Sequence, residues 1–213
     1  MIQAADGNLY GVTTAGGSMG GGVVFKMTPS HNVTVLHNFS GATDGGNQVG
    51  GLVEATDGNL YGTNNVGGTS SWGVLFRITP AGTFTVLHNF DWNTGASPQT
   101  TLLQHTNGIL FGDTAVGGTG ATGDGTFYSF DLGLPPFVTF LPGGGRAGAR
   151  VQILGQGFTG TPAVSFNGVP ADFTVSFSTY LTAIIPTGAT SGFITVTTPS
   201  GTLKSNKKFI VWP

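Results

Sequence analysis

The sequence contains no cysteine and few charged residues, and each scarcity narrows what the protein can be. Without cysteine there is neither a disulfide framework nor a thiolate metal site. Only 8% of the residues are charged, and the formal net charge is −2. A protein that neutralises phosphates needs a basic stripe, which seven scattered lysines and arginines do not supply. We therefore expect no nucleic acid partner.

Long apolar runs are also missing. No stretch approaches the roughly 20 residues of a membrane-spanning helix, so we expect no transmembrane segment. Met1–Gly11 has neither the basic start nor the apolar core of a signal peptide. We nevertheless expect an extracellular or cell-surface protein, in keeping with the lack of cysteine, with its export signal upstream of this chain.

Glycine is abundant, with 38 residues, and it falls at regular positions within an internal repeat. The motif Asp-Gly-Asn-Leu-Tyr-Gly occurs at 6–11 and at 57–62, and it returns in eroded form at 107–112. A glycine pair follows each copy, and the run Thr-Val-Leu-His-Asn-Phe at 34–39 is duplicated at 85–90. Periodic glycine of this kind marks turns between regular elements.

Each repeat predicts four short antiparallel strands. Asp-Gly-Asn is a hairpin signal, because glycine and asparagine tolerate the positive φ angles of tight turns. In the second repeat the expected strands are 52–55, 60–63, 74–78 and 83–88. Strand count and period favour β-propeller blades at about 1–48, 49–99 and 100–132, the third lacking its fourth strand. The competing interpretation is a stacked β-solenoid.

Three blades, one of them incomplete, do not close a propeller ring of about four to eight blades. Unpaired flanks would invite aggregation. The repeats therefore predict either a piece of a longer protein or a homodimer that closes a six-bladed ring.

A second domain is expected at 133–213, after the proline pair Pro135–Pro136 breaks the glycine rhythm. Alternating apolar patterns and short turns predict an immunoglobulin-like β-sandwich. The expected fold class is thus all-β. The predicted strands are Phe137–Phe140, Arg150–Gly155, Ala163–Phe166, Ala171–Ser176, Tyr180–Ile185, Gly192–Thr197 and Lys207–Val211.

The two halves of the chain resemble two different protein families. The segment Gly148–Phe158, which reads G-A-R-V-Q-I-L-G-Q-G-F, resembles the opening of IPT/TIG domains, and the likeness continues to about Val211. It implies a spacer or a protein-contact module. Residues 1–132 resemble the GloVer-type tandem repeats of secreted bacterial proteins. The segments that carry the likeness are Asp57–Thr63, Gly67–Gly68, Gly73–Pro80 and Leu87–Phe90. That resemblance implies architecture and export, and no defined activity.

The candidate catalytic residues are His37 and His88, which occupy the same position in the duplicated strands. Strand alternation places Val35, His37 and Phe39 on one face. If the two histidines converge near a propeller axis, they offer general bases or metal ligands. A repeated structural hydrogen bond explains both equally simply. Gly16–Gly20 matches the nucleophile-elbow pattern G-x-S-x-G, but it lies in a glycine-rich loop where a chance match is the better explanation.

Loops that follow the histidine strands are rich in oxygen donors. Asp44 and the pair Asp91 and Asn93 are the candidate metal ligands, because Ca²⁺ prefers such groups. Asx-turn chemistry accounts for the same residues. Trp72 and Trp92 fall in loops, where an aromatic platform binds sugars or partner side chains. Packing between blades is the alternative for each tryptophan.

The favoured function is a secreted or surface-exposed bacterial binding or adhesion module, with a protein, glycan or small molecule as its unidentified ligand. The alternative is a propeller-based hydrolase, such as a Ca²⁺-dependent lactonase or esterase, in which a metal polarises an ester carbonyl. The alternative rests on analogy of fold, which is weak support because one fold hosts many functions.

Overall fold

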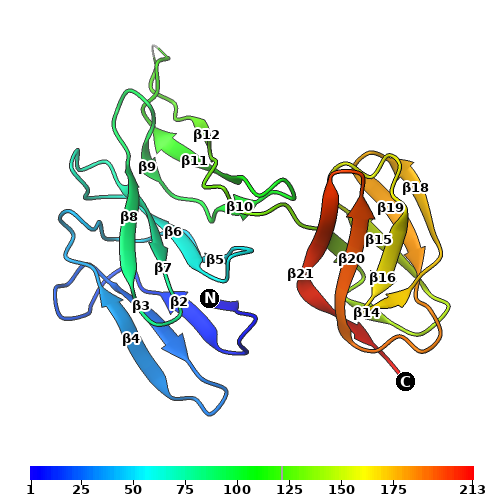
Figure 1. The fold of residues 1–213 in the computed structure, drawn as a ribbon. Helices are drawn as coiled ribbons and strands as arrows, with labels where there is room; N and C mark the ends of the chain where they lie inside the picture. Colours follow the sequence, from blue (N-terminus) through cyan, green and yellow to red (C-terminus); the bar gives the residue numbers. More distant parts are fainter. Residues whose placement is uncertain (121) are drawn as a thin grey trace. The chain divides into compact units, whose positions relative to one another are not determined.

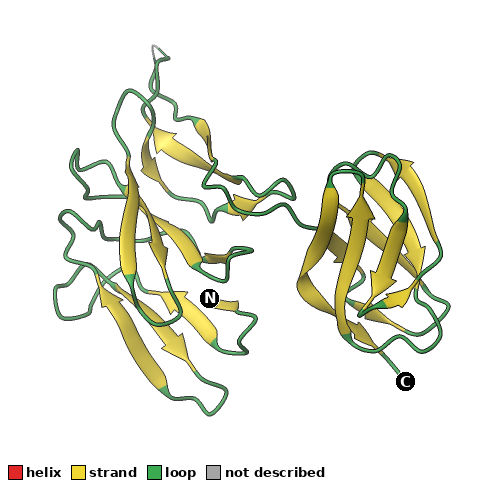
Figure 2. Cartoon of the chain, viewed as in Figure 1, coloured by secondary structure: helices red, strands yellow, loops and turns green. Residues whose placement is uncertain are grey.

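The structure, a computed structural model, describes residues 1–120 and 122–213 (Figure 1). It is all-β: in these two ranges the regular elements are strands, without a helix (Figure 2). A helix long and apolar enough to cross a membrane is accordingly not found among the described residues. The chain divides into two compact units, one of residues 1–105 and 109–132, the other of residues 106–108 and 133–213.

Three four-stranded sheets make up the first unit, one for each sequence repeat. In sheets 1 and 2 the strands follow the chain order, β1-β2-β3-β4 and β5-β6-β7-β8. In sheet 3 the path is β10-β11-β12, with β9 pairing to the far half of β11. The strands are β1 (Ile2–Gln3), β2 (Leu9–Val12), β3 (Val23–Met27), β4 (Val33–Asn38), β5 (Val53–Glu54), β6 (Leu60–Asn64), β7 (Val74–Ile78), β8 (Phe84–Asn89), β9 (Ala96–Pro98), β10 (Leu103–Gln104), β11 (Leu110–Val116) and β12 (Phe127–Phe130).

Meanders of four strands were expected for the first two repeats, and the third was expected to lack its last strand. The strand order matches both expectations. Strand β9 was not expected, because its residues read as part of a connecting loop.

In sheets 1 and 2 the repeated motif closes the first hairpin with side-chain hydrogen bonds, an arrangement that we call the clasp. The Asp57 carboxylate accepts hydrogen bonds from the Asn59 backbone at 3.0 Å, the Asn59 side chain at 2.7 Å and the Tyr61 hydroxyl at 2.8 Å. The first copy makes the same three bonds from Asp6, at 3.0, 2.8 and 2.7 Å. The motif therefore has a structural role: the aspartate fixes the turn, and the tyrosine ties the turn to the adjoining strand.

A β-bulge changes which side chains of β4 share a face. Val24 lies opposite His37 and Phe25 lies opposite Val35, with a register shift between the two pairs. Because Val24 and Phe25 point to opposite faces, Val35 and His37 do so as well. The expectation from simple alternation was therefore wrong at this point. Strand β8 has the same bulge.

Sheets 1 and 2 pack face to face over a shared apolar core. Tyr10 and Val24 of sheet 1 cluster with Leu60, Phe76 and Ile78 of sheet 2, and all five are fully buried. Side chains also join the starts of consecutive repeats. The Ala5 backbone donates to both carboxylate oxygens of Glu54, at 3.1 and 2.9 Å. In the next junction the Gln104 amide replaces that carboxylate, bonding the Thr56 backbone at 3.0 Å and its hydroxyl at 2.9 Å.

Two sheets that enclose one apolar cluster form the second unit. Their orders are β13-β15-β19-β18 and β14-β21-β20-β16-β17. Val151 and Leu181 from the first sheet meet Phe166, Ile194 and Phe209 from the second in that cluster. The strands are β13 (Thr139–Leu141), β14 (Gly144–Gly145), β15 (Arg150–Leu154), β16 (Ala163–Phe166), β17 (Val169–Pro170), β18 (Phe173–Phe177), β19 (Tyr180–Ile184), β20 (Gly192–Thr198) and β21 (Gly201–Val211).

Candidate functional site

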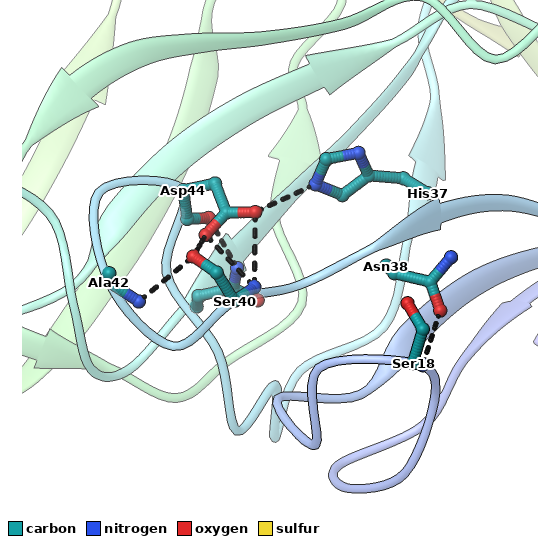
Figure 3. A network of polar contacts seen from close by, with 7 residues as sticks. Ser18, His37, Asn38, Ser40, Ala42 and Asp44 are labelled. Atoms are coloured by element: carbon teal, nitrogen blue, oxygen red, sulfur yellow. Dashed lines mark hydrogen bonds and ion pairs between the residues drawn. The ribbon is translucent and has the colours of Figure 1, made fainter.

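A network of polar contacts follows β4 (Figure 3). His37 Nε2 lies 3.0 Å from Asp44 Oδ2. The Ser40 backbone donates to both oxygens of the same carboxylate, at 3.1 and 3.2 Å, and the Ser40 hydroxyl donates to Oδ1. The Ala42 backbone in turn donates to Ser40 Oγ at 3.1 Å. The carboxylate thus closes the loop of residues 40–44 onto the end of the strand.

The loop holds the carboxylate of Asp44 as an anion. Burial opposes its ionisation, but hydrogen bonds from Ser40 and His37 outweigh burial and lower the pKa of Asp44 below its ordinary value. The His37 ring stacks flat on Phe84 of sheet 2, at 3.9 Å between ring centroids and an interplanar angle of 3°. It also meets the edge of Phe39 at 5.0 Å. One imidazole therefore joins a charged loop to an apolar junction.

The order of groups in this network does not match that of a serine hydrolase. In such an enzyme the imidazole contacts the serine hydroxyl and takes its proton, while the carboxylate orients the far side of the ring. Here the Asp44 carboxylate lies between His37 and Ser40 and bonds both. The arrangement is that of a carboxylate-centred loop closure.

The G-x-S-x-G match has a structural explanation as well. The Ser18 backbone donates to the Asn38 side chain at 2.9 Å (Figure 3). Thr69, at the equivalent place in the second repeat, makes the same 2.9 Å bond to Asn89. Both glycine loops are anchored by the asparagine that ends the fourth strand of their sheet. No helix follows Ser18 in the part of the chain described, which a nucleophile elbow requires.

His88 lies in a different environment from its twin. It packs against Phe90 and Phe130, at 5.0 and 4.9 Å, in the junction between sheets 2 and 3. Burial lowers the pKa of His88, and the charge of Asp91 partly offsets this effect. His37 and His88 lie on β4 and β8, the last strands in their sheets' order, and occupy separate aromatic pockets. The structure does not bring the two imidazoles together.

The predicted metal ligands are similarly dispersed. Asp91 Oδ1 accepts from the backbones of Asn93 and Thr94, each at 2.8 Å, and from the Thr94 hydroxyl at 3.1 Å. These bonds, the Thr94 backbone first, lower the pKa of Asp91. The bonds of Asp91 form an Asx turn, whereas Asp44 closes the loop of residues 40–44. Within residues 1–120 and 122–213, no three His, Asp or Glu side chains are placed to hold one metal ion.

The two loop tryptophans, by contrast, are brought together. The rings of Trp72 and Trp92 lie 5.2 Å apart with an interplanar angle of 55°, and 37% and 46% of the two residues is exposed. Gly123, from the glycine loop of the third repeat, lies beside the Trp92 ring, where a Cβ atom would come within 3.1 Å. The pair is therefore formed by two loops of the second repeat and lies beside the glycine loop of the third.

A cleft of about 370 Å³ opens on sheet 3. Phe127 and Leu103 line it and are 76% and 63% exposed, and Phe111 stacks on Phe127 at 5.5 Å. Asp113, which accepts from the Thr100 hydroxyl at 2.6 Å, adds a carboxylate. Phe111 occupies the repeat position of Tyr10 and Tyr61, which are buried, but it is itself only half-buried. The repeat pattern alone does not reveal this cleft, because exposure here depends on the neighbouring sheet.

The fold and these sites define a class of protein: an all-β protein of tandem sheets whose repeated residues hold turns and junctions. The model of the Gloeobacter/Verrucomicrobia repeat matches residues 1–154, and the chain belongs to this family. The match extends past the three sheets to the end of β15. No curated protein matches the chain.

Among solved structures, a fungal alcohol oxidase in complex with copper is 18% identical, with a TM-score of 0.39 over 96% of this chain and 51% of its own. The gamma-CGTase from alkalophilic Bacillus clarkii is 17% identical, with a TM-score of 0.32 over 72% of this chain and 24% of its own. The chain thus spans about half or less of these proteins. Both TM-scores are low, and neither likeness bears on function.

Proposed function

We propose that the protein is a bacterial binding module, exported or displayed at the cell surface, that binds glycans through Trp72 and Trp92. In this proposal the three sheets are successive β-propeller blades, and the second unit is an IPT/TIG-type immunoglobulin-like sandwich that acts as a spacer. The antiparallel meanders and their face-to-face packing support the blades. Two sheets around one apolar cluster support the sandwich.

The observation that carries the proposal is the exposed tryptophan pair at positions where the repeat does not need large side chains. The bridge between Gly67 and Trp72 has its counterpart between Gly16 and Gly21, so Gly21 is the equivalent of Trp72. The carbonyl of Ala42 accepts from the following glycine loop at 2.7 Å, as does that of Trp92. The junction between sheets 1 and 2 thus has Gly21 and Ala42 at these positions. The junction between sheets 2 and 3 has two tryptophans there instead.

Packing of the junction therefore does not explain the tryptophans. Two half-exposed indoles leave apolar surface in water, which is unfavourable unless a ligand covers it. Their contact fixes each ring against the other, so little conformational freedom is lost when a ligand binds.

A sugar ring suits this surface. The C–H groups on one face of a pyranose pack on an indole, while its hydroxyls need polar partners at the rim. The loop that carries Trp92 supplies Asp91, Asn93 and Thr94 beside it. Charge is scarce throughout the chain, which favours a neutral ligand. The hydrolase alternative has no comparable support, since His37 and His88 lie apart and Asp44 separates His37 from Ser40.

Affinity electrophoresis tests the proposal. The chain is run in native gels containing cellulose-type, starch-type, xylan or mannan polysaccharides, and binding slows its migration. We expect at least one neutral polysaccharide to retard the wild type. We expect Trp72→Gly and Trp92→Ala to abolish this retardation. These substitutions give the second junction the residues that the first junction has at the equivalent positions, Gly21 and Ala42.

Trp212→Phe is the matched control, because Trp212 is also half-exposed (52%) but lies in the second unit. It should migrate as the wild type does. The proposal is refuted if no polysaccharide retards the wild type. It is equally refuted if the double variant Trp72→Gly, Trp92→Ala, with unchanged circular dichroism, is retarded as strongly as the wild type.

A further inference from the structure

The two junctions between consecutive sheets of the first unit are built in the same way. We call the side of a sheet that packs on the following sheet its forward face, and the other side its backward face. The forward face of sheet 1 presents Tyr10 and Val24 to Phe76 and Ile78 on the backward face of sheet 2. All four are fully buried.

The second junction repeats this pattern with different side chains. On the forward face of sheet 2, Tyr61 and Leu75 are 2% and 0% exposed. On the backward face of sheet 3, Tyr128 and Phe130 pack against Phe90 of sheet 2, at 5.1 and 6.2 Å between ring centroids. The chain therefore packs the forward face of one sheet on the backward face of the next sheet twice, between sheets 1 and 2 and between sheets 2 and 3.

Among the described residues of the first unit, no sheet packs on the forward face of sheet 3. Strand register identifies Phe127 as the equivalent of Leu75, since Phe127 pairs with Asp113 as Leu75 pairs with Thr63. Leu75 is fully buried, whereas Phe127 is 76% exposed. The cleft of about 370 Å³ lies on this uncovered face.

The described residues of the first unit also place no sheet on the backward face of sheet 1. The register of Phe25 with Val35 in β3 and β4 matches that of Phe76 with Val86 in β7 and β8. Phe76 is completely buried, but Phe25 is only half-buried and Val35 is 49% exposed. Val33, farther along β4, is 61% exposed. Sheets 1 and 3, at the two ends of this unit (Figure 1), therefore both carry exposed apolar residues on their outer faces.

We propose that the forward face of sheet 3 binds the backward face of sheet 1 of a second copy of this chain. The occupant follows from continuity: the same two kinds of face already pack together twice within the chain, and a second copy supplies both. Two such contacts, related by a twofold axis, close a ring of six sheets, which lies within the usual propeller range of about four to eight blades.

The new junction is more polar than the two within the chain. Asp113 stands where Thr63 stands in sheet 2, and His105 where Ala55 stands. Thr100 donates to Asp113 at 2.6 Å and satisfies one of its oxygens. Burial of the remaining carboxylate surface is unfavourable, so the dimer is reversible and forms in a concentration-dependent way. The two junctions within the chain do not depend on concentration, because their sheets belong to one polypeptide.

Light scattering coupled to gel filtration tests the proposal on the full chain, from micromolar to near-millimolar concentrations. We expect the mass to rise from 21.7 kDa toward twice that value and no further. Phe127→Lys and Val35→Lys each place a charge on one of the two faces. Because both side chains are exposed in the single chain, the variants should fold, as circular dichroism will verify, and remain monomeric.

An equimolar mixture of the two variants provides the sharpest measurement. In a mixed dimer, sheet 3 of the Val35→Lys copy meets sheet 1 of the Phe127→Lys copy, so one junction is wild type and dimer reappears. Phe177→Lys, at a 69% exposed site of the second unit, should dimerise as the wild type does.

Three results overturn the proposal: a wild type that is monomeric at every concentration, a mass that grows beyond two chains, or folded Phe127→Lys that dimerises normally. Failure of the mixture to recover dimer also overturns it, because the proposal gives the mixed dimer one wild-type junction.

Discussion

The clasp between Asp57 and Tyr61 offers a direct measure of what the repeated motif contributes to stability. Tyr61→Phe keeps the aromatic ring, which is 2% exposed, and removes only the hydroxyl that bonds Asp57 at 2.8 Å. Asp57→Ala removes that bond together with the two bonds to Asn59 that fix the turn. The two variants therefore separate the link between turn and strand from the turn itself.

The magnitude follows from the chemistry of the bond. A hydrogen bond to a charged group contributes about 1.5–3 kcal/mol. Asp57 is exposed, so water replaces part of the interaction, and Tyr61→Phe should cost about 1.5 kcal/mol, at the lower end of that range. For a unit of this size, the corresponding fall in Tm is roughly 5 °C. Asp57→Ala should cost about 3 kcal/mol, because it also removes the Asx turn.

The assay is urea unfolding followed by tryptophan fluorescence in a Trp212→Phe background. Its signal then comes from Trp72 and Trp92 of the first unit alone. Tyr10→Phe should match Tyr61→Phe, since Tyr10 bonds Asp6 at 2.7 Å. The reasoning fails if Tyr61→Phe unfolds at the wild-type urea concentration, or if Asp57→Ala costs no more than Tyr61→Phe.

Three further outcomes are expected. Burial, followed by hydrogen bonding to an aspartate, raises the pKa of Tyr10 and of Tyr61 from 10.0 to about 12. The free energy of unfolding should therefore be level below pH 10 and fall as the pH rises toward 12. Thermal melts over this pH range should show a smaller fall in Tm for Tyr61→Phe than for the wild type. Gly73→Ala places a Cβ atom within 2.4 Å of the Asn64 carbonyl at a φ of +104°, whereas Gly58→Ala (φ +77°) meets no atom within 4 Å. Equilibrium unfolding should show a loss of more than about 3 kcal/mol in the free energy of unfolding for Gly73→Ala and of about 1 kcal/mol for Gly58→Ala. Equal losses would contradict the steric argument. Asp44→Ala, which frees the loop of residues 40–44, should accelerate amide exchange at Ser40 and Ala42 while leaving exchange at Asn93 and Thr94 unchanged; protection that persists at Ser40 would show that the carboxylate does not hold the loop.

The sequence predicted the local elements well because its signals are local. Asp57, Gly58 and Asn59 specify a tight hairpin wherever they occur, and alternating apolar residues specify the strands on either side. The apolar residues Leu60, Val74, Phe76 and Ile78 of β6 and β7 follow this pattern, and all four are fully buried. Phe84 and Val86 of β8 alternate in the same way but are only half-buried.

Errors arose where a prediction required more than local geometry. Alternation placed Val35 and His37 on one face, but a bulge in β4 separates them, and no residue type in that strand announces the bulge. The duplicated histidines suggested a shared centre. Each instead fills its own aromatic pocket, because equivalent residues of consecutive repeats lie on separate sheets.

The sequence by itself determined three sheets of antiparallel strands, their turns and the motif that closes the first hairpin of sheets 1 and 2, since neighbouring residues alone satisfy those hydrogen bonds. Only the tertiary structure decided that Trp72 meets Trp92, that Asp44 lies between Ser40 and His37, and that Phe127 is exposed while its equivalent Leu75 is buried. The physical reason is that these facts depend on what packs against a sheet. Repeats with nearly the same local pattern therefore differ in exposure according to whether another sheet covers them.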